Sequence, residues 1–558
     1  MLRRNKVFAI SVTVGALALA GCTSSGGGGS SPSATATSSG GASGGPQRGG
    51  ALKLAAAVDV VTLDNSQAVS TIDYSLTAGA LYEGLYHVDS QGSVVAGLAD
   101  GMPKISADGL TYTITLKPNA MFAGPNFTPR AVTAEDAAYG MIRALDPNTK
   151  PAPSWGGGYL YPIQGAAEFA SGKAETVSGI KVVNDSTLQI TLTQPTSTFI
   201  YDLTIATAWP VPEEAVQKAG EKFGDSPVGA GPFYVSQWNK GQSLVLKRNP
   251  GYVDPTLPYL DEIDVSLNVD PNTQVLQLEN GTIDAPMEPF FLPQAAIQQL
   301  SQDSSITMAP TTGPTVYYWA LNNEGILKNA TLRQAVAMAI NRDVTKQFGT
   351  EARPWTQIYS SVTKQTDPNL QAIPYDPATA KTLLQQAGYA SQPIRVIYDA
   401  TDPFASAMST SLQQDLKAIG MNVEIKGLQQ AAYFGSNGYN NPKNYDMLPT
   451  YWREDYPDGQ DYMSTNFVCA QVSPPGLNVA RYCNKQVDSL LAESDALAFG
   501  SQRDDILKQI QQIVVSDAAG VGTMQVDWPA ISTQRVGALV TLPTYAPFDW
   551  KFCWVKAT

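Results

Sequence analysis

Histidine and cysteine are scarce in this chain. Its 558 residues include a single histidine, His87, and four cysteines. One histidine excludes metal sites built from several histidines and leaves little room for a histidine base. The sequence also lacks His-Glu-x-x-His, Cys-x-x-Cys and a glycine-rich phosphate loop with lysine. We therefore expect no metal, no cofactor and no catalytic residue, although 49 acidic residues leave paired carboxylates open.

Positive charge is also in short supply. Lysine and arginine total 36 against 49 acidic residues, which gives a formal net charge of −13. Nucleic acids and anionic lipids are bound by clustered lysine and arginine, so neither is an expected partner. At ~150 residues per domain, the length predicts two to four domains.

Only one long apolar run is present, and it lies at the N-terminus. Basic residues at positions 3, 4 and 6 precede the uncharged segment Val7–Ala20. This segment is short for a bilayer span, which takes about 20 apolar residues. The order of basic, apolar and small residues is typical of a secretory signal peptide, here residues 1–21.

Cys22 directly follows Leu-Ala-Gly and so resembles the bacterial lipoprotein signal. The resemblance implies cleavage before Cys22 and a diacylglycerol, with palmitate as an acyl chain, on its thiol. The alternative is an unmodified N-terminus in which the cysteine falls there by chance. We expect the protein at the extracytoplasmic face of the cell membrane, held by this lipid alone.

Residues 22–50 comprise this cysteine and a tract of Gly, Ser, Ala and Thr. Few of its side chains can be buried, so we expect a flexible tether. The folded body is expected from residue 51 onward.

Two of the remaining cysteines are near neighbours in sequence. Cys469 and Cys483 can close a short loop in an oxidising compartment, and we predict a disulfide between them. Three free thiols are the alternative. Cys553 has no evident partner.

The body mixes strand and helix patterns. Residues 110–117 alternate apolar and polar side chains, which predicts a half-buried strand. Thr133 with two acids in the next turn predicts a helix start, as does Asp376-Pro377 for a helix that ends at Gly388. A further helix is expected after Ala330. The fold class is therefore α/β, or mixed α+β, with several domains.

A series of segments resembles, in the same order, the family 5 extracellular solute-binding proteins of ABC importers, the oligopeptide- and dipeptide-binding lipoprotein family. The segments are Val95–Leu98, Ser106–Leu116, Val132–Ala137, Pro227–Pro232, Arg248–Tyr252, Arg333–Ala335, Ala339–Arg342, Tyr375–Tyr389 and Trp452–Asp458. The resemblance extends from Ala51 to the C-terminus.

The resemblance implies a two-lobed periplasmic-binding-protein-like fold of the large, peptide-binding class. Lobe 1 would comprise residues 51–314 and 517–558, with an extra subdomain near residues 95–220. Lobe 2 would comprise residues 315–516. The ligand would lie between the lobes, which close by hinge rotation. His87 falls in a segment that is structural in the family, so we expect it to be non-catalytic.

The richest candidate site is the run from Tyr451 to Tyr456. Peptide-binding members of the family have an aspartate, here Asp455, that pairs with the ligand's α-ammonium. An enclosed cation needs such an anion to offset its lost hydration. If the run is extended, Arg453 and Asp455 share a face and could instead form a structural pair. Trp452 and Tyr456 are candidates for lining a pocket, with packing as the alternative.

Arg481 is a second candidate. It lies in Asn478–Cys483, which resembles a family segment that approaches the cleft beside a disulfide-closed loop. Its guanidinium suits a ligand carboxylate, although structural contacts are the alternative. The aromatic residues at positions 317–319 are expected mainly in the core, although strand alternation would turn some of them toward the cleft.

These features predict a monomeric, lipid-anchored receptor. It would capture a peptide or peptide-like solute and deliver it to an ABC permease in the membrane. Other solutes, such as a chelated metal or a sugar, remain open as ligands. A signalling receptor for peptides and a surface hydrolase using two carboxylates are the alternatives from other classes.

Overall fold

The computed structural model describes residues 45–68, 70–150, 155–310, 315–349, 352–435, 438–472, 476–544 and 547–556. The expected signal peptide, Cys22 and most of the predicted tether lie outside these residues. Within the described ranges, no helix combines the length and apolar character needed to cross a membrane.

The end of the predicted tether contacts the folded body. The Arg48 guanidinium donates to the Pro255 carbonyl at 2.8 Å, and the Gly49 amide donates to the Tyr259 carbonyl at 2.8 Å. Strand β1 (Ala51–Ala55) follows at once. Contacts with the body are therefore already present at Arg48, slightly before the expected boundary.

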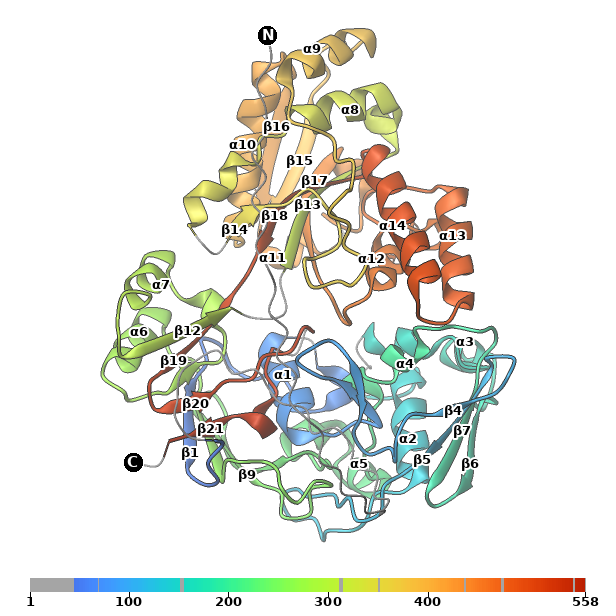
Figure 1. Ribbon diagram of the computed structural model, residues 1–558, viewed down its shortest axis with the longest axis vertical. Coiled ribbons are helices and arrows are strands. Elements are labelled where there is room, and N and C mark those ends of the chain that lie inside the picture. The colour runs from blue at the N-terminus through green and yellow to red at the C-terminus, as the bar shows by residue number, and fades with distance from the viewer. Residues whose placement is uncertain are drawn as a thin grey trace, which may run out of the picture. The chain divides into compact units, whose positions relative to one another are not determined.

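The first part of the chain builds two larger sheets and the two-stranded sheet of β2 (Tyr86–Val88) and β3 (Val94–Ala96) (Figure 1). The five-stranded sheet has the order β11 (Ala285–Pro286), β1, β10 (Glu262–Ser266), β9 (Ser243–Arg248) and β8 (Phe233–Asn239). The four-stranded sheet has the order β4 (Lys104–Ile105), β5 (Thr111–Thr115), β7 (Thr187–Thr191) and β6 (Ile180–Asn184). β5 confirms the strand predicted from alternation.

Helix α2 (Ala134–Leu145) packs against the four-stranded sheet. Thr133 caps it as predicted, because its side chain and that of Asp136 each bind the other's backbone amide. Shorter helices complete this part of the chain. They are α1 (Thr71–Leu76), α3 (Ala166–Ala170), α4 (Phe199–Asp202), α5 (Glu213–Ala219), α6 (Pro271–Glu279) and α7 (Gln294–Leu300).

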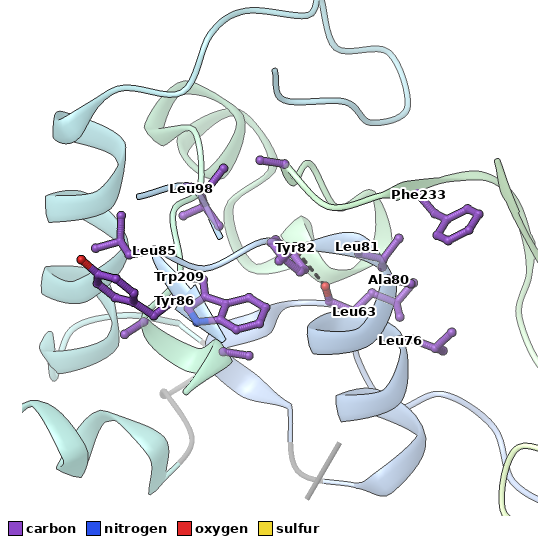
Figure 2. Packing of buried hydrophobic residues seen from close by; sticks show 14 of the residues in the cluster. Leu63, Leu76, Ala80, Leu81, Tyr82, Leu85, Tyr86, Leu98, Trp209 and Phe233 are labelled. Atoms are coloured by element: carbon purple, nitrogen blue, oxygen red, sulfur yellow. Dashed lines mark hydrogen bonds between the residues drawn. The ribbon is translucent and has the colours of Figure 1, made fainter. Parts of the chain in front are cut away.

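One large apolar core joins these elements with the end of the chain. Its buried side chains come from residues 52–287 and 530–555. Figure 2 shows a part in which the Tyr82 hydroxyl donates to the Leu63 carbonyl at 2.8 Å. Gly84 lies so close to Trp209 that a Cβ would sit 2.4 Å from the indole nitrogen. A side chain at position 84 would therefore displace Trp209.

The second sheet-centred part is a six-stranded mixed sheet. Its order is β14 (Ala352–Pro354), β18 (Gly520–Val526), β13 (Thr315–Leu321), β17 (Met447–Arg453), β15 (Ile394–Asp399) and β16 (Val423–Leu428). Its helices are α8 (Ala330–Ala339), α9 (Pro377–Gln386), α10 (Pro403–Ala418), α11 (Gln430–Tyr433), α12 (Gly459–Asn466), α13 (Lys485–Ala496) and α14 (Ser501–Ser516). α8 and α9 confirm two predicted helices.

Strand β13 is buried on both faces because helices cover both sides of the sheet. Tyr317 and Trp319 pack in a core with α8 and α10, whereas Tyr318 packs in a core with α14. These aromatic side chains alternate as a strand requires. Their expected place in the core is therefore confirmed.

Two chain segments connect the two sheet-centred parts. β12 (Ile306–Pro310) leads toward β13, and β18 leads into β19 (Pro529–Thr533), which pairs with β12. Because β18 hydrogen-bonds to β13, the chain leaves the six-stranded sheet after Val526. Residue 516, the predicted boundary, is the last residue of α14, and β18 follows it.

Candidate ligand-binding site

The Asp455 segment is a short loop between a central strand and a helix. β17 ends at Arg453, and α12 begins at Gly459. Asp458 caps α12, because its carboxylate accepts from the Gln460 amide at 2.9 Å. The loop is thus fixed at both ends, and its three acidic side chains, Glu454, Asp455 and Asp458, are all buried.

Asp455 is only 7% exposed and lies in a network of polar groups. The Tyr159 hydroxyl donates to its carboxylate at 2.5 Å. Its backbone amide donates to Asp461 at 3.1 Å, and the same Asp461 oxygen accepts from the Trp452 indole at 2.7 Å. Burial raises the pKa of both Asp455 and Asp461, and the Asp455 carboxylate raises that of Asp461 further.

No cation neutralises this pair of carboxyl groups within the part of the chain that the structure describes. In particular, there is no ion pair between Arg453 and Asp455, the alternative raised by the sequence. Arg453 is the last residue of β17, opposite Thr315 of β13. Two buried acids without a built-in cation make an environment that favours a cationic group from outside.

Asp455 lines a small cavity of about 60 Å³. The other walls come from residues 74–88, 204–209 and 542–551. This volume is below the roughly 300–1,000 Å³ of small-ligand sites, so a peptide would enter only after the walls move apart. Among the described residues of the run 451–456, Asp455 alone lines the cavity.

A second charged group in the cavity is balanced internally. Glu83 contacts His87 at 3.1 Å and accepts from the Tyr252 hydroxyl at 2.6 Å. Lys551 lies 3.2 Å from Asp549 and 3.4 Å from His87. Burial opposes ionisation of Glu83, but Lys551 and His87 outweigh it and hold its pKa at about 2. Here the fold supplies its own counter-charges.

The neighbouring acids in the loop have other partners. Glu454 accepts from Thr363 at 2.8 Å and from Tyr462 at 3.3 Å, and burial raises its pKa to about 8. Asp458 accepts two bonds from the Arg503 guanidinium, at 2.7 and 2.8 Å. Asp458 is therefore neutralised within the fold.

Around Asp455 the two sheet-centred parts touch. The rings of Tyr201 and Tyr456 stack with centroids 5.0 Å apart. The Arg503 guanidinium donates to the Ser197 hydroxyl at 3.0 Å, and the Ser197 amide donates to the Asp495 carbonyl at 2.8 Å. The Tyr159–Asp455 bond belongs to the same set of contacts. The candidate site is therefore assembled from both parts.

The two predicted aromatic candidates, Trp452 and Tyr456, lie near Asp455 but outside the wall of the cavity. Trp452 holds Asp461 through its indole nitrogen. Tyr456 is buried and packs between Tyr159 and Tyr201. Trp452 thus positions Asp461, and neither aromatic side chain lines the cavity among the described residues.

Arg481 lies elsewhere. It lines a separate hollow with Asn323, which follows β13 at the opposite end of the strand from Thr315. Asp455 follows Arg453, the partner of Thr315. Seven residues at about 3.4 Å each place the two ends roughly 20 Å apart. One short peptide therefore cannot reach both Asp455 and Arg481.

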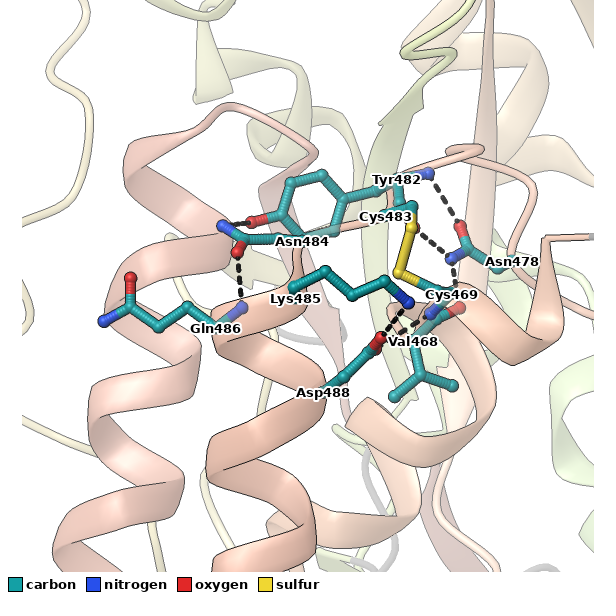
Figure 3. The surroundings of a disulfide bond; sticks show 9 residues. All are labelled: Val468, Cys469, Asn478, Tyr482, Cys483, Asn484, Lys485, Gln486 and Asp488. Atoms are coloured by element: carbon teal, nitrogen blue, oxygen red, sulfur yellow. Dashed lines mark hydrogen bonds and ion pairs between the residues drawn. A yellow bond between two sulfur atoms is a disulfide. The ribbon is translucent and has the colours of Figure 1, made fainter.

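The predicted disulfide between Cys469 and Cys483 is present, and Figure 3 shows its surroundings. The Asn478 amide group donates to the carbonyls of Val468 and Tyr482 at 2.9 and 2.7 Å. Cys553 is buried and free. The disulfide thus borders the Arg481 hollow rather than the Asp455 cavity.

Sequence reasoning missed Tyr159, Trp209 and Lys551. They lie far from Asp455 in the chain, and Tyr159 precedes it by 296 residues. No local pattern marks them. His87, the single histidine, lines the cavity within the balanced charge group.

Comparisons with known proteins agree with this architecture. The sequence profile of the bacterial extracellular solute-binding proteins, family 5 (middle region), matches residues 93–474, more than half of the chain. The glutathione-binding protein GsiB of Salmonella typhi is 29% identical over 469 residues, which cover 83% of this chain and 86% of that protein.

Two solved structures share the fold. The periplasmic binding protein DppA from Helicobacter pylori, in complex with the peptide STSA, matches with a TM-score of 0.77 and 22% identity, covering 92% of this chain and 99% of that one. A dipeptide-binding protein from Pseudoalteromonas, in complex with Met-Leu, has a TM-score of 0.73 and 21% identity, covering 91% and 100%. The predicted two-lobed, mixed α/β fold is confirmed. The chain belongs to the bacterial extracellular solute-binding proteins of family 5, the substrate-binding components of ABC importers.

Proposed function

We propose that this protein captures peptides, or peptide-like solutes, that carry a free α-ammonium group, and that Asp455 is the group that binds it. The observation that carries this proposal is the burial of Asp455 beside Asp461. Among the described residues, no lysine, arginine or histidine forms an ion pair with either carboxyl group. Elsewhere in the same cavity, Lys551 and His87 offset Glu83. A ligand ammonium would supply the charge that the Asp455 side lacks.

The relatives support a peptide-like ligand. One is named for glutathione, itself a small peptide, and two solved structures hold a tetrapeptide and a dipeptide. At about 60 Å³ the present cavity is too small for such a ligand, so a peptide would enter only when the two lobes open. Tyr159 would orient the Asp455 carboxylate, whereas Trp452 and Tyr456 would act through Asp461 and through packing.

The site would open and close by movement of the two lobes. Lobe 1 would then comprise residues up to 310 and from 529 onward, and lobe 2 would comprise residues 315–526. Closure would enclose the ligand, and the closed form would present itself to an ABC permease. A lipid on Cys22 would raise the local concentration of this monomeric receptor near that permease.

The test compares Asp455→Asn with the unaltered protein by calorimetric titration. Peptides with a free N-terminus should lose about 2–5 kcal/mol of binding free energy, because a buried charge pair is broken. N-acetylated versions of the same peptides should bind almost equally to both proteins. Asp376→Asn, an exposed cap of α9, is the matched control and should change neither.

An equal loss for free and acetylated peptides would contradict the proposal and would indicate a structural role for Asp455. The titrated peptides should be recovered intact, because a binder saturates without turnover. Cleaved products would instead favour the hydrolase alternative.

The anchor is tested separately. Cys22→Ser should move the protein from the membrane fraction to the soluble fraction and abolish labelling by a fatty-acid analogue. Unchanged membrane association would contradict lipid anchoring at Cys22.

A further inference from the structure

The Arg481 hollow, defined by its lining residues, is a concentration of positive charge on an acidic protein. The lining residues are Asn323, Lys328, Arg333, Arg481, Tyr482, Cys483, Asn484, Lys485 and Asp517. Four of them are cationic and one is acidic, while the whole chain carries a net charge of −13. The hollow has about 840 Å³ of empty space, including its opening.

The acids near the hollow offset only part of this charge. Glu324 lies 3.3 Å from Arg481 and is 53% exposed. Asp488 lies 3.2 Å from Lys485, on an exposed helical turn. Asp517 accepts from the Tyr482 hydroxyl at 2.5 Å and the Asn484 amide at 3.2 Å. Three acids therefore accompany four cations, and Asp517 alone of the three lines the hollow among the described residues.

Arg481 is held in place at the wall of the hollow. Its backbone adopts φ = +53°, a left-handed conformation that is uncommon for a residue other than glycine. Its amide donates to the Asn478 carbonyl at 3.0 Å, and Cys483, two residues on, is tied by the disulfide. Figure 3 shows how closely Asn478, Tyr482 and the disulfide pack. Such a turn fixes the direction in which the Arg481 side chain leaves the backbone.

One hydrogen-bond donor of the Arg481 guanidinium, the Nε–H group, has no acceptor among the described residues. The Arg481 side chain is only 14% exposed. A buried donor without an acceptor is costly, and native proteins rarely leave one. An acceptor bound in the hollow would satisfy it.

The other cations make the hollow suited to an anion. The Arg333 guanidinium donates hydrogen bonds to the backbone carbonyls of Leu327, Lys328 and Asp517. It therefore adds positive charge to the hollow and holds these backbone segments together. α13 starts at Lys485, and its positive helix end adds to the field. Lys328 is exposed and free to move toward a ligand.

We propose that the Arg481 hollow is a second binding site, specific for a small oxyanion such as phosphate or a carboxylate. A guanidinium fork and a helix N-terminus both match the oxygens of these groups. The site lies at the far end of β13 from Asp455, and thus acts independently of the Asp455 cavity. An anion here would cross-link the disulfide loop, α8 and α13.

The test uses the full chain and titrates inorganic phosphate, with chloride at matched ionic strength as the blank. Phosphate should bind saturably, on the order of millimolar, as befits a small and partly solvated ligand. Arg481→Gln should weaken binding about tenfold, because it removes a charge-assisted hydrogen-bond donor. Arg353→Gln, an equal charge change at an exposed arginine of β14, is the matched control and should bind phosphate normally.

Lys328→Gln provides a second variant, since this exposed side chain is not needed for folding, and it should weaken phosphate binding severalfold. Acetate in place of phosphate distinguishes the two oxyanion classes. Peptide binding at the Asp455 cavity should be unchanged in all variants. Non-saturable phosphate binding, or equal weakening by Arg481→Gln and Arg353→Gln, would overturn the proposal.

Discussion

Asp455 and Asp458 lie three residues apart in one loop, and both are buried, with exposed fractions of 7% and 2%. Their surroundings differ in one respect. Asp458 forms a bidentate ion pair with Arg503. Asp455 instead accepts a hydrogen bond from the Tyr159 hydroxyl and lies beside Asp461. The fold thus neutralises one carboxylate permanently and leaves the other for a proton or a ligand.

The comparison separates a buried carboxylate that the fold neutralises from one that has no ion-pair partner among the described residues. Burying a carboxylate is expensive unless an opposite charge accompanies it. Arg503 meets this cost for Asp458 and also contacts Ser197 of the other sheet-centred part. No such ion pair offsets the burial of the Asp455 carboxylate among the described residues, and a site of this kind favours a cationic ligand.

The largest expected effect comes from removing the built-in cation. Arg503→Met should reduce the free energy of unfolding by about 3–5 kcal/mol, because it leaves Asp458 charged and buried. Denaturant titration measures the loss. Arg353→Met breaks the exposed pair with Asp527 and should cost about 1 kcal/mol or less.

The double variant Arg503→Met, Asp458→Asn sharpens the comparison. Replacing the stranded carboxylate by a neutral amide should restore part of the stability that Arg503→Met removes. If the single Arg503 variant is no less stable than the Arg353 variant, the ion pair is not what stabilises this loop.

The second effect is a pH dependence confined to Asp455. Burial raises the pKa of Asp455 from 3.8 to about 7. Below pH 7 the empty site holds a proton that a peptide ammonium must displace. The affinity for free-amine peptides should therefore fall toward tenfold per pH unit between pH 7 and pH 5. Calorimetry in buffers of different ionisation enthalpy counts the released proton.

Stability should move in the opposite direction. A carboxyl group whose pKa is higher in the folded than in the unfolded state stabilises the fold at low pH. That contribution is lost as the pH rises through the folded pKa, about 7 for Asp455 and about 8 for Glu454. Asp455→Asn should abolish the pH dependence of binding but keep the part of the stability profile due to Glu454. Binding that is constant from pH 5 to 7 would contradict a protonated Asp455.

Local patterns predicted much of this architecture. Alternation identified β5, the Thr133 cap identified α2, and Asp376-Pro377 identified α9, because each depends on residues within a few positions. The disulfide between Cys469 and Cys483 was also predictable from its short loop.

The site itself depended on long-range placement that sequence patterns do not encode. The resemblance to a family pointed to Asp455, but the cation-free surroundings follow from which side chains the tertiary fold brings near. Arg453 is close in sequence and forms no pair with Asp455, whereas Tyr159, 296 residues away, contacts it. Arg481 and Asp455 lie near opposite ends of β13, and the sequence pattern around Arg481 does not show this.

The smallest expected effect on binding comes from removing the Tyr159 hydroxyl, which donates a hydrogen bond to Asp455. Tyr159→Phe removes a donor that lowers the pKa of Asp455, so the pH midpoint of peptide binding should move upward. Affinity at pH 7 should fall by about 0.5–1.5 kcal/mol, the usual contribution of one hydrogen bond. Tyr201→Phe keeps its stacking on Tyr456 and should leave the midpoint in place. If both variants shift the midpoint equally, the effect arises from packing, and the contrast between Asp455 and Asp458 would rest on burial alone.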